Sequence, residues 1–152
     1  MKVSELMSRD VLTIGESESC HEAAVRMGRK KSRHLPVVAD DGTLQGIVTD
    51  RDLRHHLFTP GVFDRIGSVS VQTLLKAFPV KEIMSTPVVC VSPASEVEAA
   101  ARLMREHRIG SLPVVEGGRV VGILTESDLL HHVVRANEVC CPEVEFIVVS
   151  YP

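Results

Sequence analysis

Aromatic residues are scarce in this sequence: its 152 residues include no tryptophan, one tyrosine and four phenylalanines. So few rings argue against the stacking platforms on which single-stranded nucleic acids bind. Seventeen basic residues face twenty acidic ones, and the resulting formal charge of −3 does not suit a broad nucleic-acid surface. The apolar runs are too short to span a membrane. The N-terminal residues lack the apolar core of a signal peptide.

Cysteines are few and are not arranged as a disulfide framework. The four are Cys20, Cys90, Cys140 and Cys141, and none belongs to a C-x-x-C pair. We therefore expect reduced thiols in a cytoplasmic protein. Cys20 and Cys90 lie in apolar patterns and are expected in the core. The vicinal pair at 140–141 is either an ordinary part of the C-terminal tail or a redox-active or metal-binding pair.

The motifs of common catalytic sites are also missing. The sequence contains no G-x-S-x-G elbow, no H-E-x-x-H and no G-x-x-x-x-G-K-[ST] loop. Serine, histidine and aspartate are present, but their spacing does not suggest a catalytic triad. We therefore expect that the protein is not an enzyme.

An internal duplication is the main feature that the sequence does contain. At an offset of 77 residues, 12 of the 36 aligned residues between 3–38 and 80–115 are identical. At an offset of 76, 7 of the 14 between 44–57 and 120–133 are identical. The one-residue deletion falls in a Gly-bearing turn, where a change of length costs little.

Each copy predicts the element order β-α-β-β-α. A short β-rich run is followed by apolar residues at i, i+3, i+4 and i+7, a spacing typical of a helix. These helical positions are Cys20, Ala23, Ala24 and Met27, and Val97, Ala100, Ala101 and Met104. The expected strands are 11–14, 35–38 and 44–49 in the first copy, and 88–91, 112–115 and 120–125 in the second. The last helix of each copy is expected to begin near Asp52 or Asp128.

Two candidate capping boxes mark the starts of the first helices. Ser19 with Glu22 and Ser95 with Glu98 both fit the motif. The two pairs are one residue out of register between the copies. We therefore do not expect both predicted helix starts to be correct.

The duplication divides the chain into repeat 1 (1–58), a connector (59–79), repeat 2 (80–134) and a C-terminal tail (135–152). One repeat is too small to close a core alone, so the two are expected to pack against each other. The connector segment 71–78 predicts a short helix. The tail segment 144–149 predicts a strand that either covers an edge of its own chain or pairs with another subunit.

The order of these motifs resembles that of a CBS domain, and the two copies resemble a CBS pair. The pieces that carry the resemblance are Met-Ser, an apolar strand, Ala-Ala-x-x-Met, Leu-Pro-Val-Val and Gly-Ile-x-Thr-x-x-Asp-Leu. Together they cover residues 1–58 and 80–134. The resemblance implies an α/β (α+β) fold in which two β-α-β-β-α repeats pack with pseudo-twofold symmetry and enclose ligand clefts.

The resemblance also implies an adenosine nucleotide or adenosyl ligand: AMP, ADP, ATP or S-adenosylmethionine, with no catalytic cofactor. In the family the motif aspartate accepts hydrogen bonds from ribose hydroxyls, which points to Asp52 and Asp128. The motif threonine reaches toward phosphate, which points to Thr49 and Thr125. This chemistry is sensible because a helix N-terminus attracts anions and a carboxylate can accept two O–H bonds. The alternative is that both aspartates are only N-caps and both threonines ordinary strand residues.

Further candidates surround these motifs. Gly46 and Gly122 are expected to allow close approach of a base or of facing backbone. The family also lines its site with the first strand and with the segments equivalent to 30–34 and 107–111. The remaining candidate contact residues are Arg33, His34, Pro36, Arg51, Ser111 and Pro113.

The two clefts are not expected to be equal. The first motif carries Arg51 where the second carries Ser127, and Arg33 and His34 add cationic reach to the first copy. We therefore expect phosphates to prefer the first cleft. The alternative for Arg33 and His34 is a solvated basic helix end.

We expect a freestanding adenine-nucleotide sensor that signals to a protein partner in trans and forms a homodimer. Neither nucleic acid nor membrane is expected as a partner. The candidate apolar dimer contacts are Leu53, Leu57, Leu129, Leu130, Val133 and Val134.

The alternative function is a metal-responsive or structural interaction module with vestigial clefts. It would use the histidine pairs 55–56 and 131–132, which occupy equivalent positions in the two copies. Adjacent helical residues point about 100° apart, so each pair can offer one imidazole to a shared zinc site. The other interpretation is that these are surface or core-edge histidines.

Overall fold

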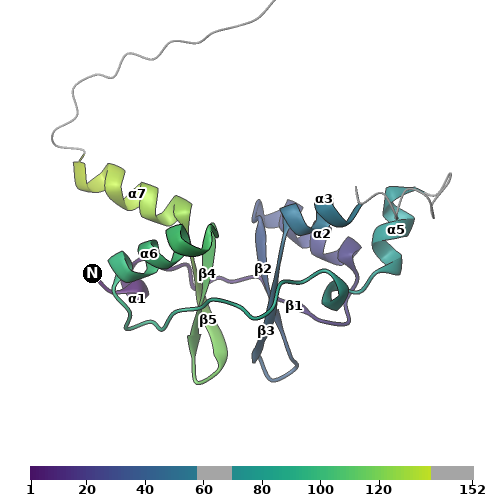
Figure 1. The fold of residues 1–152 in the computed structure, drawn as a ribbon, viewed down its shortest axis with the longest axis horizontal. Coiled ribbons are helices and arrows are strands. Elements are labelled where there is room, and N and C mark those ends of the chain that lie inside the picture. Colours follow the sequence, from purple (N-terminus) through teal and green to yellow (C-terminus); the bar gives the residue numbers. More distant parts are fainter. Residues whose placement is uncertain (58–69, 138–152) are drawn as a thin grey trace, which may run out of the picture.

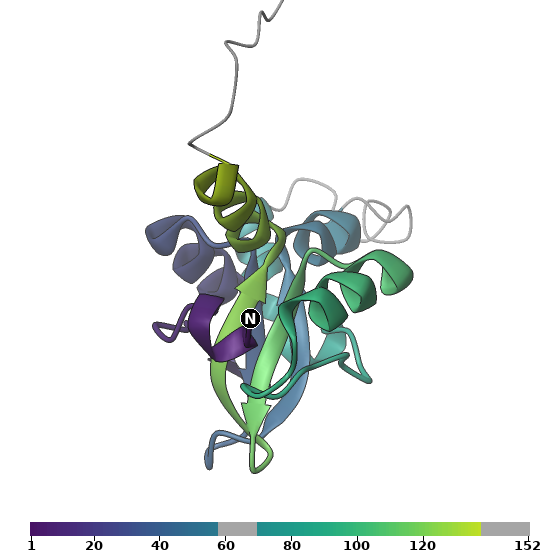
Figure 2. The same cartoon turned by 90° about the vertical axis from the view of Figure 1, so that its left-hand side faces the viewer.

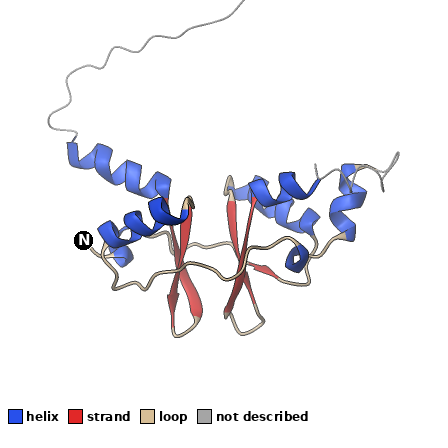
Figure 3. Cartoon of the chain, in the orientation of Figure 1, coloured by secondary structure: helices blue, strands red, loops and turns tan. Residues whose placement is uncertain are grey.

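Two β-hairpins stand next to each other at the centre of the molecule and carry helices on their outer sides (Figure 1, Figure 3). The computed structural model describes residues 1–57 and 70–137. The hairpin tips are joined, because Leu44 N donates to Gly118 O (3.1 Å) and Val120 N donates to Gly42 O (3.3 Å). The two copies of the duplication therefore form one α/β unit.

The first half follows the predicted order of elements. It comprises β1 (Ile14–Gly15), α2 (Cys20–Lys30), β2 (His34–Val38), β3 (Leu44–Thr49) and α3 (Asp50–Leu57). Strand β2 pairs parallel with β1 and antiparallel with β3. Of the expected strand 11–14 only Ile14 belongs to a strand, β1, which also includes Gly15.

The second half repeats this arrangement with α6 (Val97–His107), β4 (Ser111–Glu116), β5 (Arg119–Thr125) and α7 (Glu126–Asn137). Strands β4 and β5 are antiparallel. The expected strand 88–91 is reduced to one isolated bridge between Val91 and Val114. The last helix of each half begins two residues before the aspartate expected near its start.

Three short helices lie outside these two units. They are α1 (Val3–Leu6), α5 (Val71–Ala77) and a 3₁₀ turn (Val80–Glu82). The predicted short helix in the connector is therefore confirmed as α5. The predicted strand 144–149, the pair Cys140–Cys141 and the side chain of Leu57 lie outside the described residues.

The apolar spacing of α2 and α6 places their inner faces in two separate cores. Ala23 and Met27 of α2 are buried, as are Ala100 and Met104 of α6. Both helices end at a left-handed residue, Lys31 or Arg108.

Only one of the two predicted capping boxes receives support from the structure. The Oγ atom of Ser19 accepts a hydrogen bond from Glu22 N at 3.2 Å. The N-cap of α6 is Glu96, and the Ser95 hydroxyl accepts instead from Ser92 N. The Ser95–Glu98 box was therefore wrong.

The first residues of each repeat, 3–8 and 80–85, pack into the core of the other repeat, and we call them the exchanged segments. Val3 and Met7, at the N-terminus, are buried in the core that contains Val97 and Leu112, and Figure 2 shows α1 lying against the β4–β5 hairpin. Conversely, Val80 is buried with the first core. The core of each half is therefore completed by the first residues of the other repeat.

Backbone pairs hold these exchanged segments in place. Ser8 and Ile123 exchange two hydrogen bonds of 2.9 Å, and the equivalent Ser85 and Ile47 exchange bonds of 2.8 and 3.2 Å. The exchange therefore obeys the same pseudo-twofold relation as the repeats themselves.

Cys90 is exposed, contrary to the core position expected from its apolar neighbours. It lies between Val89 and Val91, which pack toward the second core. Side chains alternate along extended backbone, so the residue between two inward-facing valines faces outward. Cys20 is buried, as predicted.

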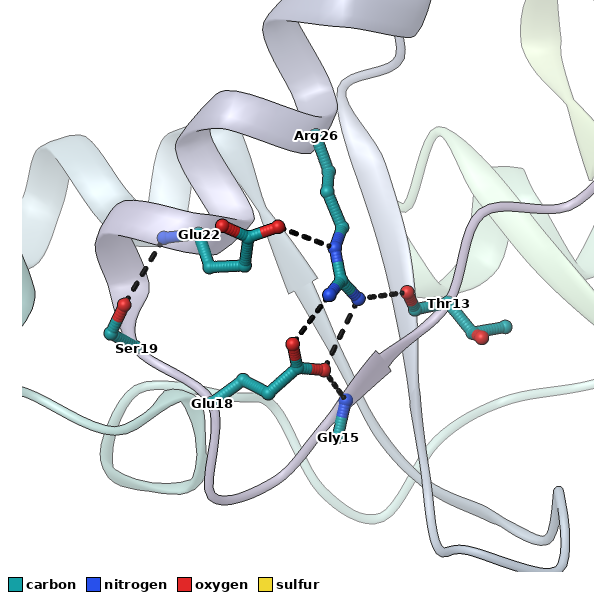
Figure 4. Close-up of polar contacts among 6 residues, drawn as sticks. All are labelled: Thr13, Gly15, Glu18, Ser19, Glu22 and Arg26. Atoms are coloured by element: carbon teal, nitrogen blue, oxygen red, sulfur yellow. Dashed lines mark hydrogen bonds and ion pairs between the residues drawn. The ribbon is translucent and has the colours of Figure 1, made fainter.

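A charged cluster around Arg26 fixes the turn between β1 and α2 (Figure 4). The guanidinium donates to Glu22 Oε1 (3.0 Å), to Thr13 O (2.9 Å) and to both carboxylate oxygens of Glu18. Glu18 also accepts from Gly15 N at 2.7 Å. In the second repeat Leu103 occupies the position of Arg26, so this cluster is confined to the first.

Candidate functional site

Two cavities lie in equivalent places in the two halves. Cavity 1 has a volume of about 440 Å³ and is lined by Thr49 and Asp52. Cavity 2 has a volume of about 380 Å³ and is lined by Thr125 and Asp128. The duplicated motif is therefore found at two equivalent cavity walls.

Each threonine–aspartate pair forms a reciprocal cap at a helix start. Thr49 Oγ1 accepts from Asp52 N at 3.1 Å, while Asp52 Oδ2 accepts from Thr49 N and Thr49 Oγ1 at 2.8 and 2.7 Å. Thr125 and Asp128 repeat these contacts at 3.3, 2.8 and 2.6 Å. The threonine is thus the N-cap residue and the aspartate lies one turn into the helix.

This cap leaves part of the carboxylate available to a ligand. Among the described residues, the hydrogen bonds to Asp52 and Asp128 all end on Oδ2. A carboxylate offers about four acceptor positions on its two oxygens. Capping therefore does not exclude contact with a ligand hydroxyl, and the two interpretations are compatible.

Apolar side chains of the other repeat face these caps. Val88, Val89 and Ile109 line cavity 1 opposite the motif of the first repeat. Val11 and Leu12 line cavity 2 opposite the motif of the second repeat. Each cavity thus combines an apolar wall with a polar helix start, an arrangement typical of small-molecule sites.

Cations are distributed unequally between the cavities. Within residues 1–57 and 70–137, three guanidinium groups at cavity 1 form no ion pair, namely Arg33, Arg51 and Arg108. At cavity 2 the corresponding groups are Lys31 and Arg33, because Lys30 pairs with Asp10 at 2.7 Å and lowers the pKa of that carboxyl. Cavity 1 therefore offers more unpaired positive charge.

One wall is common to both cavities. It consists of Arg33, His34, Gly110 and Glu126. Burial, reinforced by the charge of Arg33, lowers the pKa of His34 against the opposing effect of nearby carboxylates. The imidazole is therefore neutral at neutral pH.

Nine of the candidate contact residues lie at the cavities. Ser111 and Pro113 line cavity 1, Arg51 lines cavity 1, and Arg33 and His34 line both, together with the two threonine–aspartate pairs. Pro36 is fully buried and belongs to neither of these linings.

Gly46 and Gly122 lie beneath methionine side chains and line neither cavity. A Cβ on Gly46 would stand 2.9 Å from Met84 Cγ, and one on Gly122 would stand 3.1 Å from Met7 Cγ. The close approach expected at these glycines is therefore made by a side chain of the exchanged segment.

The sequence indicated the first strand and the segments 30–34 and 107–111 as walls of the site, but not every residue that lines it. Arg108, which lines cavity 1, and Glu126, which lines both cavities, were not singled out. Arg108 is the equivalent of Lys31 in the alignment, so the repeat contained the signal for it.

The four duplicated histidines do not gather into one cluster. Among the described residues, no group of three or more His, Cys, Asp or Glu side chains is arranged to hold a metal ion. The His56 ring instead packs edge-on against Phe78, with ring centres 4.6 Å apart. In the same part of the chain, no helix is long and apolar enough to cross a membrane.

Known proteins show the same duplicated architecture. A CBS domain-containing protein of Dictyostelium discoideum is 36% identical over 142 residues, covering 93% of this chain and 97% of its own length. Some other curated relatives are longer, and the chain spans 23% to 46% of their length.

Two similar solved structures carry different bound groups. The CBS domain pair of protein MJ0100, in complex with 5′-methylthioadenosine and S-adenosylmethionine, has a TM-score of 0.75 and 26% identity, covering 90% of this chain and 98% of its own. Hypoxic Response Protein I, with two coordinated zinc ions, has a TM-score of 0.71 and 26% identity, covering 87% and 98%.

The family assignment rests on both copies of the duplication. The family model for the CBS domain matches residues 3–59 and 80–135, which together are most of the chain. The chain therefore belongs to the CBS domain family and carries two CBS domains in tandem.

Proposed function

We propose that the protein is a regulatory module that binds an adenosine nucleotide or a related adenosyl compound in one or both cavities. The observation that carries this proposal is the pairing of a threonine–aspartate cap with an apolar wall in each cavity. The carboxylate suits ribose hydroxyls, and the apolar side chains facing it suit the flat apolar faces of a base. A similar CBS pair holds adenosyl compounds, which supports this ligand class.

Cavity 1 is the preferred site for a phosphate-bearing ligand. Its unpaired guanidiniums outnumber the unpaired cations of cavity 2. One guanidinium group can bind two oxygens of the same phosphate. The start of α3 adds the partial positive charge of a helix N-terminus.

Ligand binding would be transmitted through the exchanged segments to a protein partner. Val88 and Val89 of the apolar wall of cavity 1 come three and four residues after Ser85, whose backbone pairs with Ile47 and joins the halves. A ligand in the cavity would stabilise one arrangement of the two halves, and a partner would recognise that arrangement. In this proposal the module performs no chemistry of its own.

Thermal unfolding against a ligand panel tests the proposal. The panel comprises AMP, ADP, ATP, S-adenosylmethionine, NAD, GTP and Zn²⁺. A ligand at about 100 times its Kd adds about 2.7 kcal/mol to the free energy of unfolding and raises the midpoint by several degrees. A shift with an adenosyl ligand that is reduced in Asp52→Asn or Asp128→Asn supports the proposal. A shift with Zn²⁺ alone would favour the metal-responsive alternative.

A further inference from the structure

The two cavities share one wall, which the same residues supply to both. We propose that this shared wall makes two phosphate-bearing ligands bind with negative coupling, so that filling one cavity weakens binding in the other. The shared wall is Arg33, His34, Gly110 and Glu126. The inference rests on the proposed function and specifies how its two sites regulate each other.

The side chains of Glu126 and His34 approach Gly110 closely in the shared wall. A Cβ on Gly110 would stand 3.2 Å from Glu126 Oε2 and 3.6 Å from His34 Nε2. The carboxylate and the imidazole therefore converge on a residue that has no side chain of its own. Glu126 N also donates to Gly110 O at 3.0 Å, which holds the start of α7 against this point.

The charge of the shared wall is too small for two phosphates. Arg33 supplies one positive charge, Glu126 supplies one negative charge, and the imidazole of His34 is neutral because its pKa is lowered. A single guanidinium can make its two parallel bonds to one phosphate at a time. A second phosphate would therefore lack this cation and would also face the charge of the first across the wall.

Protonation of His34 relieves this limit. Its charged neighbours are Arg33 on its own segment, Asp50 and Asp52 on α3, and Glu126 on α7. A phosphate in either cavity adds negative charge near the ring and raises its proton affinity. When the pH falls far enough to protonate the ring, the wall gains a second cation, and the negative coupling becomes weaker.

The test must separate coupling from the intrinsic difference between the cavities. Arg51 lines cavity 1 alone, so Arg51→Gln brings the unpaired cations of the two cavities close to parity. In this background, titration calorimetry compares AMP with adenosine, which has the same base and ribose without the charge. We expect the two stepwise dissociation constants to differ more for AMP than for adenosine, by about fivefold or more, the lower range of coupling between sites.

Two further substitutions identify the group responsible, and both side chains are exposed. Arg33→Gln, added to the Arg51→Gln background, should bring the AMP steps closer to the adenosine steps because the contested cation is gone. Glu126→Gln is the matched control. It removes a fixed charge from the same wall, so it should tighten AMP binding in both cavities and leave the ratio of the steps unchanged.

Each outcome decides between the proposals. Equal step ratios for AMP and adenosine would show independent sites and overturn the coupling while leaving the proposed function intact. Coupling that persists unchanged in the Arg33→Gln variant would overturn its assignment to the shared wall. Absence of binding by adenosyl ligands to the wild-type protein would overturn both.

Discussion

The side chain of Met84 lies directly over Gly46, although the two residues belong to different copies of the duplication. A Cβ on Gly46 would stand 2.9 Å from Met84 Cγ and 3.3 Å from Met84 Cβ. Met7 covers Gly122 in the same way. The Met-Ser and Gly-Ile motifs are therefore two parts of one contact, which each half makes with the exchanged segment of the other.

This contact predicts that Gly46→Ala destabilises the protein. The added methyl group would displace Met84, and we expect a loss of about 1–3 kcal/mol, as for other overpacked sites. Met84→Ala should be costly alone but should relieve much of the effect of Gly46→Ala. Urea denaturation of both single variants and the double variant gives the interaction energy.

The second contact is the matched control for the first. A Cβ on Gly122 would also stand 3.2 Å from the backbone oxygen of Ser8. Met7→Ala cannot remove that oxygen, so it should rescue Gly122→Ala less completely. Equal rescue at both sites, or additive effects at Gly46, would contradict the proposed packing.

The sequence predicted the order of elements well because local patterns determine it. The spacing of apolar residues located α2 and α6, and the bounds predicted for the strand at Leu44–Thr49 are those observed. The exchange of Met7 and Met84 between halves was not predicted. The alignment of the two repeats is the same whether the first residues of each repeat pack on their own repeat or on the other one.

The candidate site was predicted only in part, because local patterns determine some of its residues and the packing between the repeats determines the others. Thr49 and Asp52 belong to a local motif and were found at once. Arg108 and Glu126, both in repeat 2, reach cavity 1 beside the motif of repeat 1 through the packing of one repeat on the other, and that packing is long-range. Cys90 was misplaced because neighbouring valines suggested burial, although an extended chain turns alternate residues outward.

The cluster around Arg26 is expected to stabilise the first repeat in a way that the second repeat, with Leu103 at this position, does not share. Its guanidinium holds two glutamates and a backbone oxygen, and its side chain is 28% exposed. Arg26→Leu, which copies Leu103 of the second repeat, should cost about 1–2 kcal/mol after allowance for solvent screening. Arg26→Lys should lose most of the same energy because an ammonium cannot bridge the cluster.

The exposed Arg54 provides the comparison. Its side chain is 66% exposed and pairs with Asp50 of the same helix. Arg54→Ala should therefore change the free energy of unfolding by less than about 0.5 kcal/mol. If both variants had similar effects in chemical denaturation, the cluster would contribute no more than an ordinary surface pair.

Cys20 and Cys90 predict different thiol reactivity and a pH effect. Burial, with a smaller effect of Glu82, raises the pKa of Cys20 from 9.0 to about 11. The folded protein therefore holds this proton more tightly than the unfolded chain does. Below pH 9 this thiol does not change the free energy of unfolding. Between pH 9 and 11 its ionisation lowers the free energy of unfolding by up to about 2 kcal/mol.

Peptide mapping after brief alkylation at pH 8 should show Cys90 modified much faster than Cys20. Denaturation from pH 7 to 11 should show the wild-type protein losing stability relative to Cys20→Ala only above pH 9. Parallel pH curves for the two proteins, or rapid alkylation of Cys20 in the folded state, would contradict this assignment.

The outer face of α7 predicts self-association. Leu130, Val133 and Val134 are 65%, 55% and 59% exposed and lie three and four residues apart, on one side of the helix. By contrast, Leu53 is buried and Leu129 packs against the second core, so the expected dimer contacts that remain exposed among the described side chains all lie on α7. We predict a symmetric dimer through this face, since a contiguous apolar patch favours a partner.

Leu130→Glu should therefore shift the molecular mass toward the monomer in light scattering after gel filtration. Val71→Glu is the control, because Val71 is 60% exposed on α5, away from the patch. A wild-type protein that stays monomeric at high concentration, or a dimer that Leu130→Glu leaves intact, would exclude this surface.

Two substitutions of Asp52 are expected to separate its effect on stability from its effect on ligand binding. Its carboxylate both caps α3 and faces cavity 1. Asp52→Ala removes both roles, so it should lower the free energy of unfolding by about 1 kcal/mol and weaken an adenosyl ligand. Asp52→Asn keeps an oxygen that can accept from Thr49 N, so it should retain most of the stability. It should still weaken binding, because an amide is a poorer acceptor for two ribose hydroxyls than a carboxylate.

The same pair of substitutions at Asp128 assigns the cavities. If a phosphate-bearing ligand prefers cavity 1, Asp52→Asn should reduce its affinity more than Asp128→Asn does, since each side chain lines one cavity. Calorimetric titration with AMP measures both affinities, and thermal unfolding without ligand measures the cap. Loss of stability in Asp52→Asn without loss of affinity would reduce this aspartate to a helix cap, and the ribose contact would have to be sought elsewhere.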